Sequence, residues 1–87
     1  MIQYSDNDGV SINDAIRIFG ANNADEGINA EYYLIGQIFK SLNKKWEREG
    51  QLLIKENGRV YDQLIIRDEE DIVYKVWFDI TDFYGKF

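Results

Sequence analysis

The 87-residue chain contains no cysteine, no histidine and no proline. Without cysteine it has no disulfide framework, no thiolate nucleophile and no cysteine-built zinc site. Without histidine it lacks the usual general base near neutral pH and the commonest metal ligand. Without proline it lacks a stiff linker between domains. These absences predict one small domain that is not an enzyme and holds no metal or cofactor.

Basic residues are also scarce, since 16 acidic side chains outnumber 10 basic ones and give a net charge of −6. That sign opposes binding to the phosphate backbone of a nucleic acid. No apolar run reaches the roughly eighteen residues of a membrane span, and the N-terminus has no signal-peptide pattern. The hydrophobic share of 45% is typical of a folded globular domain. We therefore expect a cytoplasmic protein that binds neither nucleic acid nor membrane.

The first residues predict an arm followed by a strand. Residues 1–13 are polar, and we expect them to form a flexible arm outside a single domain of residues 14–87. Apolar side chains then recur up to Phe19, which indicates a short strand that ends at Gly20.

The next segment predicts a helix over residues 24–43. Asn23 is a suitable N-cap, and Glu26 stands at the third helical position, where a capping box has its acidic member. Apolar residues then recur every three or four positions and are expected to face the core. These residues are Ile28, Tyr32, Ile35, Phe39 and Leu42.

The C-terminal half predicts a hairpin. Asn57 and Gly58 lie between two apolar segments and indicate a two-residue turn, because both turn positions need a positive φ. This turn places Glu56 opposite Arg59 and fixes the pairing of the two strands.

A second turn is expected over Asp68–Asp71, where it places Arg67 opposite Ile72 and, further along, Tyr61 opposite Phe78. The predicted fold is therefore α+β, a strand–helix–three-stranded meander in which a single helix covers one face of one sheet. Pairing of the first strand stays open, beside either the second or the fourth strand.

This register divides the strands between two unlike faces. The expected core face under the helix carries Leu52, Ile54, Tyr61, Gln63, Ile65, Ile72, Tyr74, Val76, Phe78 and Ile80. The second face mixes apolar and charged residues, namely Leu53, Lys55, Val60, Asp62, Leu64, Ile66, Val73, Lys75, Trp77 and Asp79. Because one helix cannot cover both faces, the second is expected to be covered by the N-terminal arm, by residues 83–87 or by another protein.

The second face is a candidate protein-binding surface, since an apolar patch around a tryptophan with charges at its rim is typical of an interface core. Trp77 would supply desolvated contact area, and carboxylates would meet Lys or Arg of a basic partner. Crowded carboxylates repel one another unless a cation offsets them. The predicted binding residues are Asp62, Trp77 and Asp79 on the sheet and Asp68, Glu69, Glu70 and Asp71 at the turn. An acidic surface that serves only solubility is the alternative.

Other candidate sites fit less well. Asp6–Gly9 resembles part of a calcium loop, but Tyr4 and Ala15 stand where such a loop needs carboxylates. The serines have no histidine to activate them, and the glycines lack the spacing of a phosphate loop. Paired carboxylates could catalyse hydrolysis only in a cleft that keeps one of them protonated.

Several short segments resemble a group of small bacterial immunity proteins of contact-dependent growth inhibition and related polymorphic toxin systems. The segments are Gly20–Asn23, Glu26–Tyr32, Asn57–Asp62, Val76–Thr81 and Phe83–Lys86. The resemblance implies a protein that binds one cognate toxin domain, often a nuclease, and blocks its active site or substrate surface. Because immunity proteins share no common fold, the resemblance predicts a role and not an architecture.

Two other functions stay open. One is a self-associating structural or adaptor domain that uses the second face as a symmetric dimer interface. The other is a small carboxylate-dependent hydrolase, which requires a carboxylate pair in a cleft.

Overall fold

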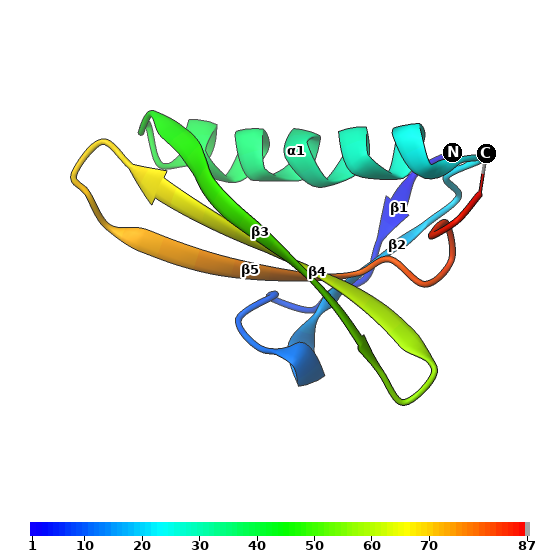
Figure 1. The fold of residues 1–87 in the computed structure, drawn as a ribbon. Coiled ribbons are helices and arrows are strands. Elements are labelled where there is room, and N and C mark those ends of the chain that lie inside the picture. The colour runs from blue at the N-terminus through cyan, green and yellow to red at the C-terminus, as the bar shows by residue number, and fades with distance from the viewer. Residues whose placement is uncertain (87) are drawn as a thin grey trace.

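A computed structural model describes residues 1–86 and shows a five-stranded sheet with one helix against it (Figure 1). The elements are β1 (Gln3–Tyr4), the short 3₁₀ helix η1 (Ile12–Asp14), β2 (Ile16–Phe19), α1 (Ala24–Ser41), β3 (Trp46–Glu56), β4 (Arg59–Asp68) and β5 (Val73–Asp79). The strand order is β1-β2-β5-β4-β3, and neighbours are antiparallel except β2 and β5, which are parallel. The predicted α+β class is confirmed, and the first predicted strand, β2, lies beside the last one, β5.

Residues 1–13, predicted as a flexible arm, contribute a strand to the sheet and contact α1. Tyr4 pairs with Ile18, which makes β1 an edge strand of the sheet. The Tyr4 hydroxyl donates a hydrogen bond of 2.7 Å to the carbonyl of Ala30 in α1. The sequence prediction missed this strand because only two residues pair, in a segment dominated by polar side chains.

α1 begins where the sequence predicts. The side chain of Asn23 accepts a hydrogen bond of 2.9 Å from the amide of Glu26, which confirms the N-cap. The Glu26 carboxylate lies 3.4 Å from the amide of Asn22, one residue before the amide that a capping box predicts. The helix ends at Ser41, close to the predicted end, and Asn43 follows with a φ of 55°.

The buried face of α1 is rotated from the predicted stripe. That stripe includes Ile28 and Leu42, which are 42% and 51% exposed. The buried helix residues are Gly27, Ala30, Glu31, Ile35 and Phe39. A charged residue and a glycine therefore occupy core positions that a pattern of apolar side chains does not identify.

β3 and β4 form the predicted hairpin. Asn57 and Gly58 have φ angles of 52° and 77°, as a two-residue turn requires. Glu56 lies opposite Arg59, and the predicted register of this hairpin is confirmed.

The second turn differs from the prediction by one residue. The Asp68 amide donates a hydrogen bond of 3.0 Å to the Ile72 carbonyl, so these two residues are partners across a three-residue loop. Asp71, the last loop residue, has a φ of 62°. A three-residue loop of this kind ends with one residue in the left-handed region. Consequently Arg67 lies opposite Val73, and the predicted pairing of Arg67 with Ile72 is wrong.

A shift of one residue exchanges the faces of β3 and β4 relative to β5. The side chains that share the helix-covered face are Asp62, Leu64 and Ile66 of β4 with Tyr74, Val76 and Phe78 of β5. Leu64, Ile66 and Phe78 are fully buried there. Leu52, Ile54, Tyr61, Gln63 and Ile65, predicted for the core, lie instead on the opposite face with Val73, Lys75, Trp77 and Asp79.

Candidate functional site

We call this opposite surface of β3, β4 and β5 the outer face, and it is the candidate site. α1 lies on the other side of the sheet, while η1 lies on the outer side at one end (Figure 1). The C-terminal tail also packs on α1, because the Ala24 amide donates a hydrogen bond of 3.0 Å to the Lys86 carbonyl and Phe83 is buried beside Gly27. Phe87, the last residue of the predicted tail, lies outside the described residues. Within residues 1–86, neither α1 nor the C-terminal tail covers the outer face, and the N-terminal segment reaches only one end of it through η1.

The outer face is apolar at its centre. Leu52 is 52% exposed and Val73 is 46% exposed. Ile54, Tyr61, Ile65 and Trp77 are half-buried on the same face. Gln63 lies between Leu52 and Trp77 in the register, so an amide interrupts the apolar surface at one position.

Trp77 and Leu64, predicted to share this surface, lie on opposite faces. Leu64 is fully buried beneath α1, whereas Trp77 remains on the outer face and is half-buried. The predicted apolar surface around the tryptophan therefore exists, but different neighbours from β3 and β4 form it.

Asp62 lies in the core and not on the predicted surface. It is 2% exposed and faces Glu31 of α1, which is 1% exposed. Both carboxylate oxygens of Asp62 accept hydrogen bonds of 2.8 Å from Nε2 of Gln51. Burial, together with the hydrogen bond and the charge of Asp62, raises the pKa of Glu31 to about 10. Glu31 is therefore protonated at neutral pH and can donate a hydrogen bond to Asp62.

This carboxylate pair does not provide the cleft that a hydrolase requires, because both side chains are closed to solvent. The Oε1 atom of Glu31 is buried without a hydrogen-bond partner. One sequence signal could have revealed the pair, namely that Glu31 stands four residues before Ile35 and eight before Phe39, on the buried stripe of the helix.

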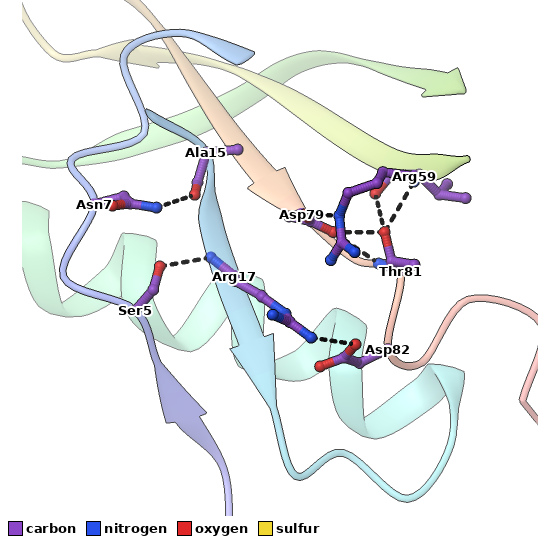
Figure 2. A network of polar contacts seen from close by, with 9 residues as sticks. Ser5, Asn7, Ala15, Arg17, Arg59, Asp79, Thr81 and Asp82 are labelled. Atoms are coloured by element: carbon purple, nitrogen blue, oxygen red, sulfur yellow. Dashed lines mark hydrogen bonds and ion pairs between the residues drawn. The ribbon is translucent and has the colours of Figure 1, made fainter. Parts of the chain in front are cut away.

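Asp79 is used inside the fold as well (Figure 2). Its carboxylate lies 2.7 Å from Nε of Arg59 and accepts a hydrogen bond of 2.6 Å from the Thr81 hydroxyl. Burial alone would raise the pKa of Asp79, but the hydrogen bonds from Arg59 and Thr81 outweigh it and lower the pKa below its usual value. Thr81 in turn accepts a hydrogen bond of 2.9 Å from the Val60 amide, so this cluster fixes the end of β5 against β4.

A second polar cluster joins the N-terminal segment to the same region (Figure 2). Ser5 accepts a hydrogen bond of 2.8 Å from the Arg17 amide, and Asn7 donates one of 2.9 Å to the Ala15 carbonyl. The Arg17 guanidinium lies 3.0 Å from the carboxylate of Asp82. These contacts hold residues 5–7 beside β2.

Asp68, the first acid of the second turn, is buried and fully bonded. Its carboxylate accepts hydrogen bonds from the amides of Glu70 and Ile72, at 2.9 and 3.0 Å, and from the Tyr74 hydroxyl at 2.8 Å. Burial opposes ionisation, but these hydrogen bonds and Lys44 outweigh it and lower the pKa of Asp68. Asp68 therefore closes the loop as an acceptor and is not available to a partner.

The other three acids of the turn are exposed, and cations of the same chain lie beside two of them. Glu70 is 2.8 Å from Lys44, and Asp71 is 3.7 Å from Arg67. Glu69 accepts a hydrogen bond of 3.3 Å from a backbone amide of the segment before β3. The predicted crowding of four carboxylates is therefore offset within the chain, and it does not by itself require a basic partner.

Four of the seven predicted binding residues remain accessible. Trp77 lies on the outer face, and Glu69, Glu70 and Asp71 lie at the turn that ends this face. Val73 and Lys75 separate them along β5. The surface can thus offer an apolar centre with an acidic end.

The described residues form neither a metal site nor a membrane-spanning helix. Residues 1–86 contain no group of three or more Asp, Glu, His or Cys side chains placed to hold a metal ion. No helix among these residues is both long and apolar enough to cross a membrane. Comparisons with protein-family models, curated proteins and solved structures found no match to this chain.

Proposed function

We propose that this chain is an immunity protein that binds and neutralises a toxin domain, a nuclease being the class we favour, through the outer face of its sheet. The observation that carries the proposal is the apolar centre of that face, which neither α1 nor the C-terminal tail covers. Large exposed apolar surfaces with a polar rim are typical of protein-interaction sites.

Apolar and acidic residues would contribute to binding in different ways. Trp77 and Leu52 supply contact area that loses water in a complex, as interface anchors do. Glu69, Glu70 and Asp71 lie at the rim, where charge raises the association rate and selects the partner more than it adds affinity. The net charge of −6 acts in the same direction toward a basic domain.

Growth inhibition tests the proposal. The C-terminal domain of the polypeptide encoded immediately upstream of this chain is expressed in a bacterial host, alone and together with this chain. We expect the domain alone to stop growth and the co-expressed chain to restore it. Absence of toxicity from the upstream product, or toxicity that the chain does not relieve, would contradict the immunity role.

A matched pair of substitutions tests the surface. Trp77→Ala should weaken binding to the toxin domain by about thirtyfold or more, since truncating a central aromatic anchor typically costs 2 kcal/mol or more. Tyr33→Ala is the control, because Tyr33 is an aromatic residue of α1 that is 64% exposed on the opposite side. Equal losses from both variants, measured by calorimetry, would count against the outer face.

A further inference from the structure

β5 has a neighbour on both sides along only half of its length. Phe78 and Asp79 pair with β2, and the Trp77 amide donates a hydrogen bond of 2.8 Å to the Gly9 carbonyl. The preceding residues, from Val73 onward, pair with β4 alone. The first half of β5 is therefore an open sheet edge beside the part that β2 and Gly9 occupy.

The open edge presents backbone groups in a regular order. Backbone groups of alternate residues in an antiparallel strand point to the same side. The Trp77 amide points away from β4, toward Gly9, so the N–H and C=O groups of Val73 and Lys75 point to that same side. Such groups are a template for pairing with another strand.

Apolar side chains flank this edge above and below the sheet. On the helix side, a groove of about 350 Å³ runs between α1 and β5, and residues 8–10 also line it. Ile38 and Leu42 line it and are 38% and 51% exposed. Ile72 and Val73 at the start of the strand are each 46% exposed. Pairing at this edge would cover all four residues.

We infer that this chain forms a symmetric dimer in which the β5 edges of two copies pair antiparallel, with Val73 opposite Val73 of the second copy. In this register Lys75 of each copy lies beside the loop that precedes β5 in the other copy, near Asp71. Lys75 is exposed, and the side chain of Asp71 is 85% exposed even with Arg67 of its own chain 3.7 Å away, so a second cation can approach it. Because the dimer is symmetric, the interface would contain two such pairs of opposite charges.

Gly9 selects this register over the neighbouring one. Pairing centred on Tyr74 would also align the free backbone groups, but it would place Asp71 of the second copy beside Trp77. The Gly9 carbonyl already occupies that position. The overlap therefore stops at Lys75.

The other edge of the sheet is protected against such pairing. β3 is longer, but its register with β4 shifts between Arg48 and Gly50, which marks a β-bulge. Bulges and charged side chains are devices that keep edge strands apart. Glu47, Arg48 and Glu49 add charges beside the bulge. The paired part of β5 carries no bulge, and the acids of the turn before it end at Asp71.

The dimer would leave the part of the outer face around Trp77 free, although Val73 and Asp71 at the end of that face would lie at the interface. A two-fold axis perpendicular to the sheet keeps both outer faces on the same side, so a ten-stranded sheet would present two copies of the surface around Trp77. The inference is tested independently of the proposed function, because self-association is measured without a toxin domain.

Sedimentation velocity over a range of concentrations tests the dimer. We expect the wild type to pass from monomer to dimer in the micromolar range. Lys75→Pro removes an outward-pointing N–H at the proposed interface and should leave the chain monomeric. Lys55→Pro is the control, because it makes the same exchange on β3, and this variant should dimerise like the wild type. Circular dichroism of each variant verifies that the fold is retained.

A charge exchange tests the register. Lys75→Glu places like charges near each other twice and should weaken the dimer by about tenfold or more. Adding Asp71→Asn removes the repulsion, suits the positive φ of this position and should recover part of the loss. A chain that stays monomeric at high concentration, or a dimer that Lys75→Pro does not affect, would overturn the inference. The first result would leave the edge to a segment of another protein, and the second would place the interface elsewhere.

Discussion

Glu31 is the residue whose protonation the fold changes most. It lies beneath α1 against Asp62, in surroundings that favour a neutral carboxyl group. A protonated Glu31 donates to Asp62, while Gln51 of the edge strand β3 donates to Asp62 from the other side. This buried polar contact joins the sheet to the helix.

Glu31→Gln should remove a pH dependence of stability. The pKa of Glu31 rises from an ordinary 4.5 to about 10 on folding, so between these values the unfolded chain loses the proton while the folded chain keeps it. Stability therefore falls as pH rises across this window, with a limiting slope of about 1.4 kcal/mol per pH unit. Glutamine also donates a hydrogen bond, but it is neutral at every pH, so it loses no stability when the unfolded chain would release the Glu31 proton. The variant should therefore be more stable than the wild type at neutral pH.

Urea unfolding between about pH 6 and pH 9 measures this slope. Glu47→Gln, the same exchange at an exposed position of β3, is the control and should keep the wild-type pH profile. Parallel profiles for the wild type and Glu31→Gln would mean that Glu31 is ionised in the folded chain.

At the scale of single elements, the two glycines of α1 have opposite surroundings. A Cβ at Gly27 would overlap the ring of Phe83, whereas nothing lies within 4 Å of a Cβ at Gly36. Gly27→Ala should therefore lower the free energy of unfolding by about 1–3 kcal/mol, the cost of overpacking. Gly36→Ala should raise it by up to about 1 kcal/mol, because alanine favours the helix. Thermal unfolding of both variants decides between these signs, and a stabilising Gly27→Ala would show that the C-terminal tail does not pack on α1.

The same elements show what local sequence patterns can predict. The N-cap at Asn23 and the turn at Asn57–Gly58 depend on a few adjacent residues, and both are confirmed. The second turn contains no glycine, and its left-handed position is taken by Asp71. Four consecutive acidic residues do not indicate whether the loop contains three or four residues. The predicted register of β5 against β4 was therefore wrong by one residue.

That single shift explains most of the error in the candidate site. It moved Asp62 and Leu64 beneath the helix and brought Leu52, Ile54 and Ile65 beside Trp77. Asp79 stayed on the predicted face, but Arg59 and Thr81 hold it within the fold. Of the predicted apolar surface, Trp77 and Val73 lie on the outer face, but other neighbours from β3 and β4 surround them, and the chain uses three of the predicted acids internally.

At the scale of the whole molecule, charge and apolar area should act on different rate constants of partner binding. Long-range attraction between a chain of net charge −6 and a basic domain accelerates encounter and is screened by salt. Contacts of Trp77 form only after docking, so they should govern dissociation. Association with the toxin domain should therefore slow by on the order of tenfold from low to high salt, while dissociation changes little.

Surface plasmon resonance at several salt concentrations separates these effects. Replacing the exposed acids of the turn together, by Glu69→Gln, Glu70→Gln and Asp71→Asn, should slow association and flatten its salt dependence. Trp77→Ala should instead accelerate dissociation and keep the wild-type salt dependence, because it leaves every charge in place. An association rate that does not respond to salt would mean that the acidic end of the outer face has no part in finding the partner, and an unchanged dissociation rate for Trp77→Ala would exclude the outer face as the docked surface.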